Sequence, residues 1–296
     1  MLKTYQESFT NFLTYEKRHS THTVTAYKND LDQFVQFCTI VVGEFNVKKI
    51  SNDLVRGWGL HLMENGNTPK TVRRKIATLR ALFKFLMITG IITEDPTRGL
   101  ILPKVRKKLP YFVEEKRLAH LLDDGLFSDD FKGTRNKLII ALLYGTGVRL
   151  SELLNLKDSD IDTNSYLIKV LGKRKKERII PYPRSINTLL NQYFEIRDKT
   201  IGFTPENLLV TEKGKKIYEK LIYRVVTTNL EKVTSLEKKS PHILRHTYAT
   251  HLLNRGADLN AVKELLGHSN LSATQIYTHI TFDKMHNIYK QAHPRG

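Results

Sequence analysis

The sequence predicts a mainly helical protein of two domains that carries one small β-hairpin or sheet. Three observations indicate this fold class. Residues 1–92 repeat apolar positions at helical spacing, a basic stretch at 95–110 with two prolines within eight residues interrupts the pattern, and two short β-rich runs at 166–171 and 177–182 flank a very basic turn. The expected boundaries are therefore a helical domain at 1–94, a linker at 95–110 and a second domain at 111–296.

The helices of the first domain have recognisable start and stop signals. Ser51 is expected to cap one helix, which ends at Gly66. Thr68 is expected to cap the next, Pro69 occupies its first turn, and Gly90 ends it. The four expected helices lie within 5–18, 23–38, 51–66 and 68–90.

In the second domain, a strongly apolar helix at 134–147 ends in glycines. Further helices are expected at its opening stretch and at 183–197, 218–233 and 258–267, the last ended by Gly267. A final amphipathic helix is expected at about 281–291.

The chain of 296 residues has a formal net charge of +18, and its basic excess runs through both domains. An excess spread in this way suits a partner that carries phosphates along its length, although a merely soluble basic protein is the plainer interpretation. The single cysteine, Cys38, can form neither an internal disulfide nor a zinc cluster. No signal peptide or membrane span is apparent, so we expect a cytoplasmic protein without membrane contact.

The stretch 240–253, "SPHILRHTYATHLL", places an arginine among leucines. Ser240 can cap this helix and Pro241 can begin it. At helical spacing, Arg245 then falls inside the apolar stripe formed by residues such as Leu244 and Leu252. A buried guanidinium cannot lose its charge, so this position predicts a waiting anion.

A second arginine, Arg149 in "GTGVRLSE", stands at the start of another helix, where backbone N–H groups also favour an anion. Two guanidiniums that converge on one phosphate can neutralise the charge that develops during phosphoryl transfer. A plain structural ion pair between Arg149 and Glu152 is the alternative.

Metal and nucleotide chemistry are not indicated. His242 and His246 have the spacing of two metal ligands, but no third ligand is obvious, and the acidic residues are scattered. We therefore expect neither a metal nor a cofactor, so the nucleophile would be a side chain. Tyr277 in "QIYTH" is one candidate, and the residues alone favour Tyr144 or Tyr248 equally.

Several motifs in order, "GTGVRLSELLNL", "GKRKKERIIPYP", "SPHILRHTYATHLLNRGADLNAVKELLGHSNLSATQIYTHI" and the ending "IYKQAHPRG", resemble those of the tyrosine recombinases, most closely the Xer-type enzymes of bacteria. The resemblance covers nearly all of 111–296, and 1–92 resembles the helical, SAM-like core-binding domain of the family. It implies a C-shaped clamp on DNA, with an α/β catalytic domain.

The resemblance also implies the roles of six residues. Arg149 and Arg245 would hold the scissile phosphate, Tyr277 would attack it, and His242 and His268 would flank it. Lys173 would protonate the leaving oxygen. The family usually has Gly-Lys-Gly at this turn where this chain has Gly-Lys-Arg, so Lys175 and Lys176 remain alternatives. His246 would support the site.

DNA contacts are expected from basic side chains of the fourth helix, the linker and the hairpin turn, although a solvated surface explains such charges equally well. The candidates are Lys70, Arg73, Arg74, Arg80, Lys104, Arg106, Lys107, Arg174, Lys175 and Lys176.

The expected activity is site-specific cleavage and rejoining of DNA strands through a 3′-phosphotyrosyl link. Chromosome dimer resolution (a part of chromosome partition and cell division), element integration or excision, and inversion all remain open. A type IB topoisomerase and a catalytically silent architectural DNA-binding protein are the alternatives. The resemblance further implies a homo- or hetero-tetramer on two DNA sites, with the helix at 281–291 docked on the next subunit, and suggests a septal DNA translocase as a partner.

Overall fold

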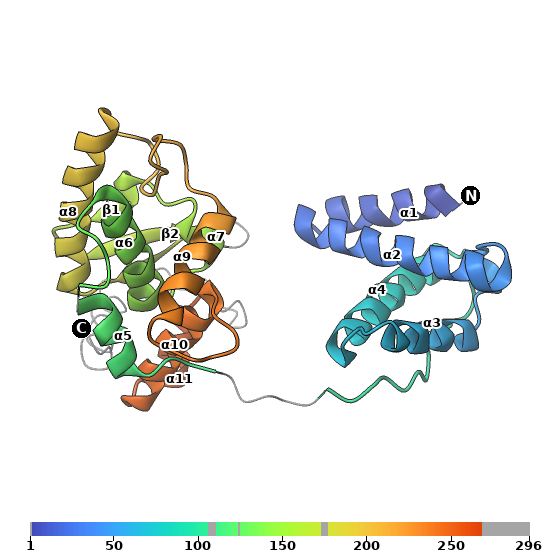
Figure 1. Ribbon diagram of the computed structural model, residues 1–296. Coiled ribbons are helices and arrows are strands. Elements are labelled where there is room, and N and C mark those ends of the chain that lie inside the picture. The colour runs from blue at the N-terminus through green and yellow to red at the C-terminus, as the bar shows by residue number, and fades with distance from the viewer. Residues whose placement is uncertain (1, 106–110, 124, 173–176, 268–296) are drawn as a thin grey trace. The chain divides into compact units, whose positions relative to one another are not determined.

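The computed structural model describes residues 2–105, 111–123, 125–172 and 177–267. The chain divides into two compact units, residues 1–108 and 109–296, each with its own hydrophobic core. The helical fold with a small sheet that the sequence predicts is confirmed (Figure 1).

The described residues of the first unit form four α-helices and two short helical turns, and Figure 1 labels the α-helices. These are α1 (Leu2–Asn11), the π-turn Phe12–Glu16, α2 (Thr21–Val42), the 3-10 turn Val47–Lys49, α3 (Asn52–Glu64) and α4 (Pro69–Ile88). The predicted caps are confirmed, because Ser51 accepts a hydrogen bond from the backbone of Leu54 and Thr68 accepts one from Thr71.

An aromatic core holds these helices together. Phe34 of α2 lies edge-on to Trp58 of α3, with 5.0 Å between ring centroids, and Leu79 and Phe83 of α4 are fully buried beside them. The side-chain amide of Asn52 donates hydrogen bonds to the carbonyls of Pro96 and Arg98, 3.1 and 2.8 Å away. The start of the expected linker is therefore fastened to the first unit.

The second unit is built around α6 (Phe131–Thr146), which is buried on almost every side. The other helices are α5 (Glu115–Asp123), α7 (Leu150–Leu153), the 3-10 turn Asp158–Asp160, α8 (Arg184–Ile201), α9 (Glu219–Glu231), α10 (Pro241–Asn254) and α11 (Leu259–Leu265). Helices α8, α9 and α10 all pack against α6. The turn between α6 and α7 lies against α10, because Arg245 of α10 donates to the Gly147 carbonyl.

Among the described residues of the second unit, three strands form an antiparallel sheet in the order β1-β2-β3. Its strands are β1 (Ile161–Asp162), β2 (Leu167–Leu171) and β3 (Glu177–Pro181), and Val170 of β2 pairs with Arg178 of β3. Arg178 and Ile180 alternate with exposed residues along β3, so both side chains enter the core.

One cap prediction was wrong in its detail. Ser240 does occupy the cap position of α10, and Pro241 begins the helix, but the serine side chain accepts no cap hydrogen bond. The backbone N–H of Ile243 donates to the Ser240 carbonyl instead, at 2.9 Å, so this terminal donor is already satisfied.

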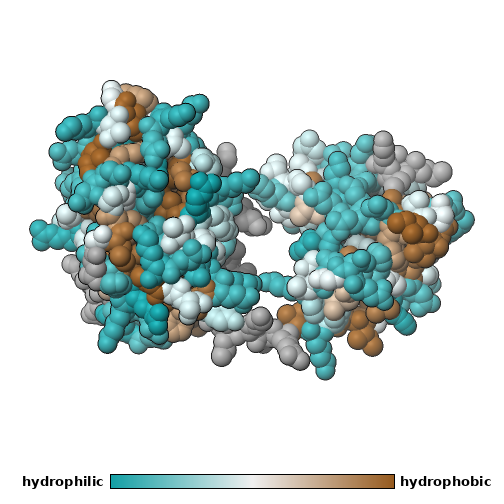
Figure 2. Space-filling model, viewed as in Figure 1, coloured by the Kyte–Doolittle hydropathy of each residue, from teal (hydrophilic) through white to brown (hydrophobic). Residues whose placement is uncertain are grey.

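The described helices include none that is both long and apolar enough to cross a membrane. The visible surface of both units is largely hydrophilic (Figure 2).

Candidate active site

The first arginine of the site is positioned by the turn between α6 and α7. Gly147 ends α6 in the left-handed conformation, with φ of 62°, and Arg149 then stands at the first position before α7. The backbone N–H of Arg149 donates to one oxygen of Glu152 at 2.8 Å. Its guanidinium donates to the other oxygen at 2.8 Å and to the Gly267 carbonyl at 2.8 Å. The Arg149 side chain remains 32% exposed, so it can still meet a ligand.

The second arginine reaches the same place from α10. The guanidinium of Arg245 donates to the carbonyls of Gly147 and Leu266. Within the part of the chain that the structure describes, Arg245 forms no salt bridge and its hydrogen-bond partners are carbonyls, although the Glu152 carboxylate is near enough to favour its charge. Burial lowers the pKa of Arg245 to about 10, and the positive charges of Arg149 and Arg178 act in the same direction. The group is still charged at neutral pH and favours an anion.

A third arginine, Arg178 of β3, was missed when the sequence was considered alone. It is only 7% exposed, and its guanidinium donates to both oxygens of Glu152 at 2.7 and 2.8 Å. The alternation of "ERIIP" carried the signal, because it places Arg178 on the same face as the apolar Ile180. A charge on the inward face of a strand needs a buried partner.

Glu152 lies at the centre of these contacts. Burial raises the pKa of its carboxyl group, but hydrogen bonds from Arg178 and from the Arg149 backbone outweigh that effect and lower the pKa to about 2. The ion pair of Arg149 and Glu152 that was the alternative to a phosphate clamp therefore exists. It is not a closed pair, because Arg149 and Arg178 share the one carboxylate and the charge of Arg245 is added nearby, so the cluster is positive overall.

The end of α11 joins the three arginines. Arg178 donates to the carbonyl of Leu265 at 3.1 Å, Arg245 donates to Leu266, and Arg149 donates to Gly267. The last carbonyls of a helix have no partner within it, and cations favour that end. Three consecutive carbonyls thus hold three guanidiniums side by side, immediately before residue 268 in the sequence.

The other predicted catalytic residues are placed only in part. His242 is exposed in the first turn of α10, and His246 lies half-buried one turn later, near the hydroxyl of Thr250. Lys173, His268 and Tyr277 lie outside the described residues.

Both alternative nucleophiles are buried. The hydroxyl of Tyr144 is 3.0 Å from Nδ1 of His251, and the tyrosine is 2% exposed. Tyr248 has no exposed surface, and burial raises the pKa of its hydroxyl. Neither oxygen can reach a phosphate at the surface without rearrangement of the core.

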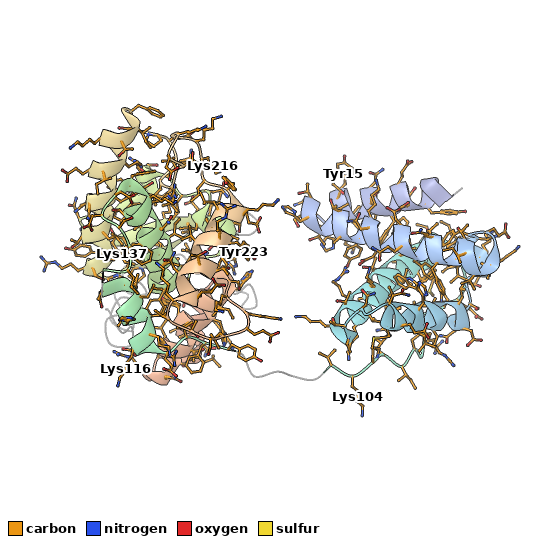
Figure 3. The ribbon with its side chains drawn as sticks, viewed as in Figure 1. Tyr15, Lys104, Lys116, Lys137, Lys216 and Tyr223 are labelled. Atoms are coloured by element: carbon orange, nitrogen blue, oxygen red, sulfur yellow. The ribbon has the colours of Figure 1, made fainter. Side chains whose placement is uncertain are left out.

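The described DNA-contacting candidates of the first unit are exposed, but one of them has a structural partner. Arg74 donates two hydrogen bonds to the carboxylate of Asp30, which is 2% exposed. Lys104 projects from the segment after α4 (Figure 3). Lys70, Arg73 and Arg80 are exposed as well, whereas Arg106, Lys107, Arg174, Lys175 and Lys176 lie outside the described residues.

Among the described residues, no group of three or more histidine, cysteine, aspartate or glutamate side chains could hold a metal ion.

Comparison with known proteins identifies the family. A model of the phage integrase family matches residues 112–284, and a model of the phage integrase N-terminal SAM-like domain matches residues 7–90. The chain belongs to the phage integrase family. It is accordingly a tyrosine recombinase, a site-specific enzyme that cleaves and rejoins DNA strands.

Similar proteins match over almost their whole length. The tyrosine recombinase XerC of Chlorobaculum tepidum is 37% identical over 94% of this chain and 90% of its own. The tyrosine recombinase XerC of Staphylococcus carnosus is 38% identical over 98% of this chain and 97% of its own. The predicted resemblance to Xer-type recombinases is therefore confirmed.

Solved structures share the fold. The Tn1549 transposon integrase in complex with transposon right end DNA matches with a TM-score of 0.71, at 19% identity over 95% of this chain and 99% of the other. The XerH recombinase bound to its difH substrate matches with a TM-score of 0.66, at 20% identity over 97% of this chain and 82% of the other.

Proposed function

We propose that this recombinase exchanges DNA strands at a specific site, with Arg149 and Arg245 as the ligands of the scissile phosphate. The convergence of these two guanidiniums on the end of α11 supports the proposal most directly. Arg245 has only carbonyl partners among the described residues, so a phosphate would supply the anion that its buried charge favours. Neither a metal nor a cofactor is needed for this arrangement.

In the proposed reaction, the Tyr277 hydroxyl gives up its proton to water while its oxygen attacks the scissile phosphorus and forms a 3′-phosphotyrosyl bond. The bond between phosphorus and the 5′-oxygen breaks, and Lys173 gives that oxygen a proton, with Lys175 and Lys176 as the alternative donors. His242 and His268 flank the phosphate. An incoming 5′-hydroxyl reverses the step and joins the strands, so the energy of the cleaved ester is kept.

The relatives favour an Xer-type role for this chain, and the candidate roles are chromosome dimer resolution and element integration, excision or inversion. We propose a cytoplasmic tetramer, built from one protein or from two related ones, on two DNA sites. A septal DNA translocase is a further proposed partner. Mapping covalent protein–DNA junctions across the host genome would show the target and separate these roles, because dimer resolution needs a single chromosomal site.

The nucleophile is tested with a DNA duplex that carries the mapped site and a nick beside it, which traps the covalent intermediate. The wild-type protein should form a complex that resists denaturant, with EDTA present. Tyr277→Phe should form none while it keeps its affinity in a gel-shift assay, since only the attacking oxygen is lost. Covalent complexes in Tyr277→Phe would place the nucleophile elsewhere. Binding by the wild type without any covalent product would favour the architectural alternative.

The proton donor is tested with a 5′-bridging phosphorothiolate, whose sulfur leaves without a proton. Lys173→Ala should cleave normal DNA slowly and recover on the phosphorothiolate. Equal defects on the two substrates would reject this role for Lys173 and direct the same test to Lys175 and Lys176.

A further inference from the structure

Arg178 is the one arginine of the cluster whose guanidinium is almost fully enclosed. All three of its nitrogens donate to protein atoms: Nη1 and Nη2 to the two oxygens of Glu152, and Nε to the Leu265 carbonyl. These bonds use three of its five N–H groups, and with 7% of the residue exposed the other two have little access to a ligand. Any effect of Arg178 on cleavage must therefore pass through its partners.

The Glu152 carboxylate is divided between two arginines. Oε1 accepts from the guanidinium of Arg149 and from that of Arg178, each within 2.8 Å. Oε2 accepts from the backbone N–H of Arg149 and from the second Nη of Arg178. If Arg178 were absent, the whole carboxylate charge would fall on Arg149, and the two would form an ordinary neutral pair.

We propose that Arg178 is a positioning residue for strand cleavage, which shares the Glu152 carboxylate so that the guanidinium charge of Arg149 remains available to the scissile phosphate. The inference rests on the proposed roles of Arg149 and Tyr277. Through the Leu265 carbonyl, Arg178 also fixes the end of α11 where Arg149 and Arg245 are held. It supports both phosphate ligands without touching DNA.

A purely structural ion pair would have different consequences, and the chain contains a matched control. Arg197 of α8 is 1% exposed and donates to both oxygens of Asp158, at 2.8 and 2.7 Å. The bidentate geometry is the same as that of Arg178 with Glu152, but Arg197 makes no contact with Arg149 or Arg245. Replacing Arg197 therefore measures how removal of a buried arginine affects the stability and cleavage rate of this unit when the arginine cluster is left intact.

The experiment measures the single-turnover rate of covalent complex formation on nicked DNA at saturating protein, where affinity no longer limits the rate. Melting curves establish the temperature at which each variant is folded. Arg178→Met should cleave at least about tenfold more slowly than wild type. Arg197→Met should cleave at the wild-type rate per folded molecule. Arg178→Lys, which keeps the charge but cannot hold both oxygens at once, should lie between, and it serves as the test variant if Arg178→Met does not fold.

Two further readouts separate positioning from folding. The double variant Arg178→Met with Glu152→Gln restores the positive balance around Arg149, so it should cleave faster than Arg178→Met alone. On a substrate with a neutral methylphosphonate at the scissile position, less positive charge is needed, so the defect of Arg178→Met relative to wild type should shrink. If Arg178 has only a structural role, the double variant should cleave more slowly than Arg178→Met, and the defect of Arg178→Met should be the same on both substrates.

The outcomes are distinct from those of the proposed function. If the wild type forms no covalent complex, or if Tyr277→Phe still forms one, the proposed function fails. If the wild type is trapped through Tyr277 but Arg178→Met cleaves as fast as Arg197→Met, only the inference about Arg178 is overturned. An Arg178→Met defect that Glu152→Gln deepens also overturns it.

Discussion

At the scale of single residues, the three arginines meet the cost of burial in three ways. Arg178 bonds both oxygens of Glu152, the guanidinium of Arg149 bonds one of those oxygens and the Gly267 carbonyl, and Arg245 bonds only the carbonyls of Gly147 and Leu266. A charged group without a charged partner gains most from an arriving anion. The free energy that each guanidinium would gain from binding a phosphate therefore increases from Arg178 to Arg149 to Arg245.

Arg149→Lys and Arg245→Lys should each slow cleavage by about 100-fold or more, because one ammonium cannot copy the planar fork of a guanidinium. Arg245 uses two separate nitrogens for two carbonyls on different segments, and a lysine would release one of them. Single-turnover rates of covalent trapping measure the effect. Wild-type rates in either lysine variant would show that positive charge alone suffices there.

Glu152→Gln should show a pH-dependent loss of stability. The folded-state pKa of Glu152 is about 2 and the reference value is 4.5, so its ionisation stabilises the fold fully above pH 4.5 and less as the pH falls toward 2. A difference of this size corresponds to about 3 kcal/mol. Urea unfolding of both proteins between pH 7 and pH 3 should give free energies of unfolding that converge as the pH falls. A constant difference would contradict this assignment.

At the scale of elements, Gly147 ends α6 at a point that lies close to Tyr248 of α10 and to Leu266 after α11. A Cβ added there would lie 2.5 Å from a ring carbon of Tyr248 in α10, and the φ of 62° already disfavours other residues. Gly147→Ala should therefore destabilise the second unit by about 2 kcal/mol or more, and should slow cleavage because α10 carries Arg245.

The matched control for Gly147 is Gly202, which ends α8 with φ of 79° and has nothing within 4 Å of an added Cβ. Gly202→Ala should show only the backbone penalty of about 1 kcal/mol, with cleavage unchanged. Thermal unfolding compares the two variants. Equal shifts in melting temperature would mean that the contact with Tyr248 does not matter.

On α4, exposed cations should divide into two kinds. Replacing Lys70, Arg73 and Arg80 by glutamine should weaken DNA binding and lower the salt slope by about one for each phosphate that is no longer bound, with little effect on the rate of bound complexes. Arg74→Gln should mainly lower stability, because buried Asp30 loses its bidentate partner. Binding across a salt series separates these effects. Unchanged affinity in the triple variant would leave this face as plain solvated surface.

The sequence was most informative where an element is defined by its own residues. Periodicity and capping residues predicted α3 and α4, since Ser51 and Thr68 bond to amides three residues away. The pairing of Arg178 with Glu152 spans 26 positions and depends on how β3 packs against α7, which no local pattern encodes. For that reason the sequence indicated only an ion pair between Glu152 and Arg149, and not the sharing of Glu152 with Arg178.

At the scale of the whole molecule, each unit holds one end of the connecting chain. Asn52 binds the carbonyls of Pro96 and Arg98 in the first unit. In the second, the backbone N–H of Val113 donates to the Thr247 hydroxyl at 3.0 Å, on the same helix as Arg245. The connection therefore enters the second unit directly against α10, the helix that carries Arg245.

The last prediction concerns the segment 282–296, which lies outside the described residues. Phe282, Met285, Ile288 and Tyr289 recur at i, i+3, i+6 and i+7, which predicts a short helix with a narrow apolar stripe. A helix of this length is unstable alone and must dock, on its own domain or, as the family resemblance implies, on the next subunit.

A head-to-tail contact of that kind closes into a ring and would link Tyr277, a few residues upstream, to the state of the neighbouring subunit. Removing 282–296 should then leave the affinity of one protomer for a half-site nearly unchanged while cooperative binding to the full site and recombination are lost. Gel-shift assays on half-sites and full sites measure both. Normal cooperativity in the truncated protein would exclude a role in assembly, and a lower melting temperature with weaker half-site binding would show that the segment docks on its own domain.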